Sequence, residues 1–386
     1  MATVESFQKL LKSLINCSKV IGLEIWTAPG KLLPASYFLF SQVLVYYIST
    51  VYTVRKYSGD TLHVMKVLIT LGTAVQLSIK FFIGLAKANK FKLLTNEIEV
   101  DLLGRFENGT ADETRVLKRT GRILWLLFRI STIYPTVGCV AFMFYPLIEY
   151  MINGAVMPLF LYELPYTDFS TTVGYIMTMV FQVTLLAVGT LGAVLSDFSF
   201  FMFAMYAMAR ADIFIVHLGE LETMLNERNP EEKLQSKLRE QWIVCLSDHQ
   251  QTTNFLNLIE DVFGFFCLVQ VVMGVIALCD GMLLVALTDW YPTYCFLLAM
   301  FTQMSIYFVI GHFVELKIDD MYNKVISMPW YKLPLKEQKE FTLLMCRQQR
   351  PMMLTACGFM TMNFETYMSV LRVLYQFFVM IMQYVG

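Results

Sequence analysis

Long apolar runs, separated by short polar stretches, dominate the pattern of hydrophobic and polar positions along this chain. A helix that crosses a bilayer needs about 20 consecutive residues of mainly apolar character. Seven segments meet this length, at about Ser36–Val54, Leu62–Ala86, Ile123–Leu147, Thr172–Leu195, Phe255–Leu287, Thr293–Val314 and Leu354–Gly386. The pattern therefore predicts an all-α, polytopic membrane protein with seven transmembrane helices.

The last of these segments carries a polar stripe along one helical face. The stripe follows spacings of three and four residues through Glu365, Ser369, Arg372, Gln376, Met380 and Gln383. Lipid cannot satisfy polar groups, so this face must meet protein or water. One such helix cannot enclose a water path, whereas several copies around an axis can. Residues 354–386 are therefore predicted to line the pore of an oligomeric channel.

The composition argues against a soluble enzyme, because 56% of the residues are hydrophobic and 15% are aromatic. Mean hydropathy is +0.55, which is typical of polytopic membrane proteins. The eight cysteines and four histidines show no metal-ligand spacing. A net charge of −1 gives no indication of nucleic acid. We expect no catalytic residue, no metal, no cofactor and no nucleic-acid partner.

Lysine and arginine residues gather in alternate connections between the predicted spans. The N-terminal segment and the connections after the second, fourth and sixth spans hold twenty-four of them, whereas the opposite side holds only Arg55 and Lys56. Positive residues concentrate in cytoplasmic loops. The N-terminus is therefore predicted to be cytoplasmic and the C-terminus extracellular, the reverse of a G-protein-coupled receptor. We expect a multi-pass protein of the plasma membrane.

The connections divide the chain into regions. We expect a cytoplasmic amphipathic segment in 1–35, lying at the inner membrane surface, spans one to four in 36–195 with an outer loop at 148–171, cytoplasmic helices in 196–254, spans five and six in 255–314, a cytoplasmic helix in 315–353 and the pore-lining span in 354–386. Apolar stripes run through the cytoplasmic regions, for example at Phe214, Trp242 and Phe341. Such faces need a partner, which is either a layer of packed anchor helices or the membrane surface.

The segment from Gly311 to Gln383 resembles the C-terminal region of insect odorant receptors. The matching features are Gly311, Pro329-Trp330-Tyr331-Lys332-Leu333, Arg347-Gln348-Gln349-Arg350-Pro351, Ala356-x-Gly358-Phe359, and a last helix with Arg372 before an aromatic end. Two departures from related proteins refine the resemblance. Thr366-Tyr367 is not followed by the gustatory receptor signature, and 196–254 lacks the large insertion of the odorant receptor co-receptor. The chain therefore resembles an odorant-tuning subunit.

The resemblance implies an odorant-gated, non-selective cation channel in sensory neuron dendrites. Its partners would be the odorant receptor co-receptor in a heterotetramer, a small volatile organic ligand, the lipid bilayer and permeating cations. The family's pore pattern places the outer constriction at Met380, Gln383 and Tyr384, with Arg372 and Gln376 further along the same helix. Met380 and Tyr384 are bulkier than the small aliphatic residues of that gate. A non-conducting or metabotropic chemosensory receptor, and a gustatory-type homomeric channel, remain as alternatives.

The resemblance also implies an odorant pocket in the outer half of the bundle, between the second, third, fourth and sixth helices. Depth along these helices places there Ile69, Thr73, Pro135, Gly138, Phe142, Thr178, Phe181, Gln182, Leu185, Tyr294, Leu297 and Phe301. Gly138 and Phe142 lie one turn apart, which sets a small gap beside a ring. Thr178, Gln182 or Tyr294 would donate a hydrogen bond to a mainly apolar ligand. Each position, taken alone, fits ordinary helix packing equally well.

Overall fold

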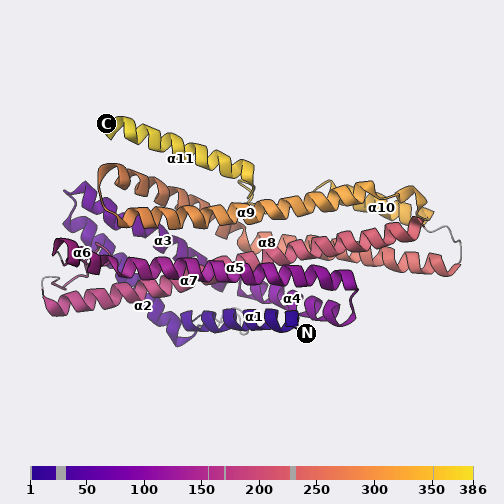
Figure 1. Cartoon of the computed structure of the whole chain (residues 1–386), viewed down its shortest axis with the longest axis horizontal. Coiled ribbons are helices and arrows are strands. Elements are labelled where there is room, and N and C mark those ends of the chain that lie inside the picture. The colour runs from indigo at the N-terminus through magenta and orange to yellow at the C-terminus, as the bar shows by residue number, and fades with distance from the viewer. Residues whose placement is uncertain are drawn as a thin grey trace.

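The computed structural model describes residues 2–22, 32–154, 156–168, 171–226, 232–350 and 352–385, without the side chains of a few residues at helix ends. These residues fold almost entirely into helices (Figure 1). In chain order the elements are α1 (Ala2–Ile21), α2 (Pro34–Lys56), α3 (Thr61–Ala86), α4 (Ala88–Asn108), α5 (Ala111–Met143), α6 (Tyr145–Asn153), α7 (Thr172–Asn226), α8 (Glu232–Leu287), α9 (Pro292–Ser327), η1 (Trp330–Lys332), α10 (Leu335–Gln348) and α11 (Phe364–Val385).

Helices α2, α3, α5, α7, α8 and α9 form one elongated bundle (Figure 1), in which α7 packs against α5, α8 and α9, and α3 packs against α8. Helix α6, the α8–α9 turn and the C-terminal end of α11 lie at one end, which we call the loop end. Helix α10, the C-terminal end of α7 and the start of α8 lie at the opposite end, which we call the extension end. The arrangement is that of an all-α, polytopic membrane protein.

Six helical segments in the described part of the chain are long and apolar enough to cross a membrane. They are Pro34–Lys56, Thr61–Ala86, Ala111–Ile152, Thr172–Asn226, Gln235–Leu287 and Pro292–Ser327. Helix α11 has 22 residues, which is about 33 Å at roughly 1.5 Å per residue. The described part of this helix is not among the six.

Local sequence signals explain where several helices begin. Proline is the first residue of both α2 and α9, a position where its missing N–H group would be unpaired anyway. Asp60 caps α3 by accepting a hydrogen bond from the His63 N–H, at 3.0 Å. Thr110 and Glu113 form a reciprocal capping box at the start of α5. These caps satisfy N–H groups that have no partner inside the helix.

The predicted fourth and fifth spans run without a break into the extension end. Helix α7 has 55 residues and α8 has 56, so each exceeds the roughly 20 residues needed to cross a bilayer. Phe214, Leu218 and Trp242 on these extensions are completely buried. They pack with Val325 of α9 and Phe341 of α10 in one cluster. The apolar stripes of the extension helices thus cover one another. Packed helices were the first of the two alternatives that the sequence left for these stripes.

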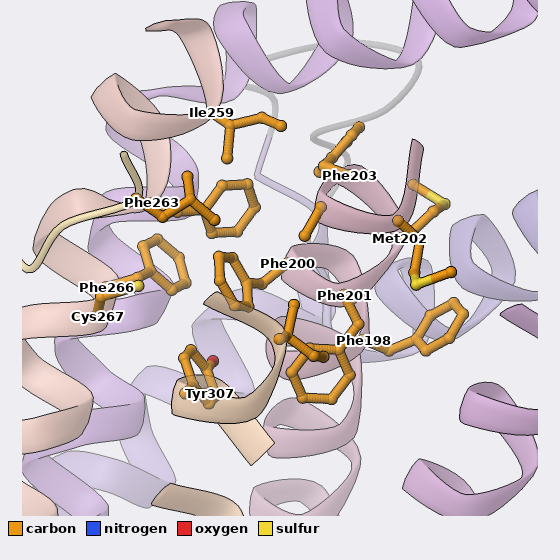
Figure 2. Close-up of a cluster of buried hydrophobic side chains, with 14 of the residues drawn as sticks. Phe198, Phe200, Phe201, Met202, Phe203, Ile259, Phe263, Phe266, Cys267 and Tyr307 are labelled. Carbon is orange, nitrogen blue, oxygen red and sulfur yellow. The ribbon is translucent and has the colours of Figure 1, made fainter. Parts of the chain in front are cut away.

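A second apolar cluster fills the middle of the bundle (Figure 2). Residues 198–204 of α7 are all buried, which is typical of a helix surrounded by others. The rings of Phe200 and Tyr307 stack with centroids 4.9 Å apart, and Phe263 of α8 lies 5.4 Å from Phe200. This cluster joins α7, α8 and α9 beside the cavity described next.

Helix α1 packs against α5 and α7. Leu10, Leu11 and Leu14 are at most 3% exposed and belong to the main apolar cluster. The amphipathic helix expected in 1–35 is therefore present, but the protein itself covers its described apolar face. Sequence periodicity identifies an apolar face without identifying what covers it.

Candidate functional site

A cavity of about 1460 Å³ lies between α2, α3, α5, α7 and α9. Most of its lining is aliphatic or aromatic, as in small-molecule sites, which usually measure about 300–1,000 Å³. It exceeds that range because it also reaches exposed residues on the outside of the bundle, such as Phe38, Val137 and Leu298. The space therefore combines an enclosed chamber with a lateral opening between helices.

Half of the predicted pocket residues line this cavity. They are Ile69, Thr73, Pro135, Gly138, Phe142 and Leu185. An added Cβ at Gly138 would meet no atom within 4 Å, so the small gap expected beside Phe142 is present. All the predicted residues of the second and third spans therefore line the cavity, whereas Leu185 is the one predicted residue of the fourth span that does.

The other half of the predicted set does not line the cavity, and those positions are Thr178, Phe181, Gln182, Tyr294, Leu297 and Phe301. The residues of α9 that line the cavity are Pro292, Thr293, Cys295, Phe296, Leu298, Ala299, Met300, Thr302, Gln303 and Ile306. Leu297 instead lies close to Gly281 of α8, where an added Cβ would sit 2.6 Å from one of its methyl groups. Depth along a helix was predicted adequately, but helix rotation was not.

Gln182 holds the outer loop in place. Its side-chain oxygen accepts from the Phe160 N–H at 3.0 Å, and its NH₂ group donates to the Phe160 carbonyl at 2.9 Å. These bonds occupy the amide that the sequence argument assigned to a ligand. Phe181 lies beneath the same loop, with its ring centroid 6.5 Å from that of Tyr162.

The outer loop forms the roof of the cavity. Phe160 and Tyr162 line the cavity, and Tyr162 is only 1% exposed. Glu163 fixes the loop by accepting from Lys56 and from Tyr57, each at 2.6 Å. Partial burial would raise the pKa of the Glu163 carboxyl, but these two donors outweigh it and lower that pKa. The acidic and aromatic composition of 148–171 was the available signal.

A polar network borders the cavity through Lys80, Asp197 and Gln303. The Lys80 ammonium contacts the Asp197 carboxylate at 2.8 Å and the Gln270 side-chain oxygen at 2.6 Å. Asp197 also accepts from Tyr307 at 2.7 Å and from Gln303 at 2.6 Å. The network therefore ties α3, α7, α8 and α9 together at one level of the bundle.

Helix α11 contacts the bundle through α8 and α9. Its buried residues are Leu374 and Ile381, and the stripe residues Glu365, Ser369, Arg372, Gln376, Met380 and Gln383 are all exposed. Figure 1 shows most of this helix lying apart from the bundle. Tyr384 belongs to α11, but its side chain lies outside the described residues. The stripe predicted from sequence thus belongs to the uncovered side of α11, which also exposes Met368, Val373, Tyr375 and Met382.

A hydrogen bond and a ring contact hold the start of α11 against α9. The hydroxyls of Tyr367 and Ser305 lie 2.6 Å apart, and the Tyr367 ring stacks on Phe308 with centroids at 5.1 Å. A short hairpin at 355–361, closed by a bridge between Thr355 and Thr361, precedes α11. Glu260 of α8 holds it by accepting from the Thr355 N–H at 2.8 Å. Helix α9 therefore contacts both the cavity and α11, as does α8 through Phe266 in the cavity lining.

The chain matches the family described as the 7tm Odorant receptor over residues 60–375. This chain belongs to the insect odorant receptor family. It is a multi-pass membrane receptor and not an enzyme, and groups of His, Cys, Asp or Glu that could hold a metal are absent from its described residues. The resemblance found in the C-terminal motifs is thereby confirmed.

The full length of this odorant receptor resembles known relatives. It is 21% identical over 396 residues to "Putative odorant receptor 83c" of Drosophila melanogaster, covering 99% of each chain. Its fold is similar to olfactory receptor OR5 of Machilis hrabei in complex with eugenol, with a TM-score of 0.76, 13% identity, and 97% and 98% of the two chains covered. A second OR5 structure gives a TM-score of 0.75 at 11% identity, with 98% and 99% covered.

The extension end of this receptor holds a second polar network. Arg105 contacts Glu113 at 2.9 Å and Asp248 at 2.6 Å. His217 lies between the same two carboxylates, 3.1 Å from Glu113 and 2.5 Å from Asp248. Burial would lower the pKa of the His217 imidazole, but the hydrogen bond and charges of its acidic neighbours outweigh burial and raise that pKa.

Proposed function

We propose that this chain is the odorant-binding subunit of a ligand-gated, non-selective cation channel of the plasma membrane. It assembles with the odorant receptor co-receptor as a heterotetramer, and α11 is its seventh transmembrane helix. The observation that carries this proposal is the uncovered polar stripe of α11, opposite the apolar face that contacts α8 and α9. Several such helices around one axis would place their stripes in water, whereas lipid would leave the polar groups unsatisfied.

The proposed orientation sets the extension end in the cytoplasm and the loop end outside. It is supported by the excess of lysine and arginine in the connections at the extension end. The pore then narrows outward along Arg372, Gln376, Met380, Gln383 and Tyr384. The constriction lies near Met380, at the outer end of α11.

The proposed ligand site is the cavity, at Ile69, Thr73, Pro135, Gly138, Phe142 and Leu185. A small volatile molecule that preferred the open arrangement of the bundle would shift the population toward it. Helix α9 would transmit the shift, because Leu298 and Thr302 line the cavity while Ser305 and Phe308 contact Tyr367 of α11. Binding of eugenol by the relative OR5 supports a ligand of this size.

Expression with and without the co-receptor, followed by recording of odour-evoked current, tests this function. Eugenol and a panel of small volatiles serve as the first ligands. We expect current only with the co-receptor, and we expect it to persist when G proteins are blocked. Current lost under that block would favour a metabotropic receptor, and current from the subunit alone would favour a homomeric channel. If this subunit contributes to the pore, substitution of Gln383 should change ion selectivity.

A further inference from the structure

The hydroxyl of Tyr162 is buried without a hydrogen-bond partner among the described residues. Its ring lines the roof of the cavity and is 1% exposed. The neighbouring ring of Tyr46 offers a comparison, since it also lines the cavity with its centroid 5.1 Å away. The Tyr46 hydroxyl is paired with the Thr70 hydroxyl at 2.9 Å. Of these two adjacent tyrosines, only Tyr162 has a hydroxyl without a hydrogen-bond partner among the described residues.

Thr293 gives a second, independent observation. It is fully buried, it lines the same cavity, and its hydroxyl has no partner in the described part of the chain. Thr293 lies at the start of α9 and Tyr162 lies in the outer loop, so separate elements supply the two groups. Buried polar groups in folded proteins are nearly always hydrogen-bonded. The unpaired hydroxyls of Tyr162 and Thr293, with the unpaired side-chain oxygen of Gln42 on the same cavity lining, therefore point to a ligand that supplies missing partners.

A row of aromatic contacts connects the two positions. The Tyr162 and Phe160 rings are stacked with centroids 5.9 Å apart, and Phe160 lies 5.3 Å from Phe142. Phe142 is followed by Tyr145 at 6.4 Å, whose hydroxyl accepts from Trp290 at 3.2 Å, and Trp290 nearly adjoins Thr293 in the chain. Both residues therefore lie at the loop end of the cavity, connected through this row of aromatic contacts.

The charged groups of the cavity come from positions further toward the extension end. Lys80 and Asp197 are paired with each other, and Arg129 lies near the middle of α5. The loop end thus offers neutral hydroxyls that can both donate and accept hydrogen bonds. This chemistry suits a neutral oxygen and not a carboxylate or an ammonium group.

We propose that Tyr162 and Thr293 are the hydrogen-bonding residues of the cavity and that its ligand is a small, mainly apolar molecule carrying a neutral oxygen, such as an alcohol, a phenol or a ketone. The oxygen lies at the loop end and the apolar body extends along α3, α5 and α9. The inference rests on the proposed function, and it assigns to that site a ligand class and two residues that determine specificity.

Tyr162→Phe and Thr293→Val remove one hydroxyl each while keeping the shape of the side chain. Tyr46→Phe is the matched comparison, because it removes a neighbouring hydroxyl that the protein already satisfies. The probes are octanol, octanone and cresol, each set against octane or toluene as the hydrocarbon of similar shape. Two readouts are used: odour-evoked current with the co-receptor, and the ligand-induced rise in unfolding temperature of the purified receptor in detergent.

We expect Tyr162→Phe to raise the half-maximal concentration of the oxygenated probes about fivefold, which corresponds to the roughly 1 kcal/mol of one hydrogen bond. The response to the hydrocarbons should stay unchanged. Thr293→Val should act in the same direction, whereas Tyr46→Phe should shift both probe classes equally. The ligand-free Tyr162→Phe receptor should unfold at the same or a higher temperature than wild type, because an unpaired buried hydroxyl is removed.

Equal sensitivity of wild type and Tyr162→Phe to oxygenated and hydrocarbon probes would overturn the inference and leave the proposed function standing. If octanol or cresol raised the unfolding temperature of the receptor but evoked no current, this result would contradict the channel function. In that event, the assignment of Tyr162 to ligand binding would still be supported if the Tyr162→Phe receptor showed no ligand-induced rise in unfolding temperature. The two proposals therefore fail separately.

Discussion

The ammonium of Lys80 on α3 lies 2.8 Å from the carboxylate of Asp197 on α7, with the two side chains only 1% and 11% exposed. Removing one partner from a buried pair leaves an uncompensated charge. We expect Lys80→Met alone to destabilise the receptor by about 3–5 kcal/mol, whereas Lys80→Met combined with Asp197→Leu should recover part of this loss. Unfolding of the single and double variants in detergent measures the coupling. Additive losses would mean that the pair does not couple α3 to α7.

Met380 and Phe142 should separate conduction from ligand sensitivity. Met380 lies on the uncovered face of α11, and Phe142 lines the cavity. We expect Met380→Ala to change ion permeation or basal current more than ligand sensitivity, and Phe142→Ala to do the opposite. Recordings of odour dose-response and ion selectivity from both variants provide the test. If both substitutions shifted only the dose-response, the pore assignment would be wrong.

Gly311 of α9 lies against the hairpin that precedes α11. An added Cβ there would meet the Met362 carbonyl oxygen at 2.1 Å, so the backbone would have to move. We expect Gly311→Ala to cost about 1–3 kcal/mol through overpacking and to lower odour-evoked current by displacing α11. Gly219→Ala on α7 is the control, because its added Cβ would meet nothing within 4 Å. Equal unfolding temperatures for the two variants would contradict this reading of the contact.

The hydrogen bonds of Gln182 make the loop over the cavity sensitive to a single side chain. Gln182→Leu leaves both the N–H and the carbonyl of Phe160 unpaired, at about 1–3 kcal/mol for each buried group. We expect faster hydrogen exchange at the Phe160 amide. Gln182→Glu keeps the acceptor for that amide and loses only the donor, so it should preserve protection at Phe160. Similar exchange in the two variants would indicate that other contacts hold the loop.

His217 should make the extension end sensitive to pH. A raised pKa in the folded state means that the stabilisation from the imidazolium is complete below the unfolded pKa of about 6.5 and is lost as pH rises through the folded value. Unfolding temperature should therefore fall between neutral and alkaline pH. His217→Gln should remove this part of the pH dependence. An unchanged profile in the variant would show that other groups, Asp248 or Glu113 included, govern it.

The sequence by itself determined the class of protein, most of the helices and the uncovered face of α11. These features follow from local physics, because apolar runs of bilayer length must be helical in lipid and a polar stripe at spacings of three and four residues must share one face. The family was equally accessible, since the motifs between Gly311 and Gln383 are short and local. Even here, the boundaries of α7 and α8 exceed the predicted spans, since amphipathic extensions continue the same helix.

The tertiary structure decided which face of each helix meets the cavity and what covers it. Depth along α9 does not determine which of its faces meets the cavity: Tyr294 and Phe301 do not line it, and Leu297 lies against Gly281 of α8. Contacts between residues far apart in the sequence decided the rest. Gln182 hydrogen-bonds to Phe160 in the outer loop, and Lys80 pairs with Asp197. The unpaired hydroxyls of Tyr162 and Thr293 likewise emerge only once the whole bundle is assembled, because hydrogen bonding between distant segments is not encoded at any single position.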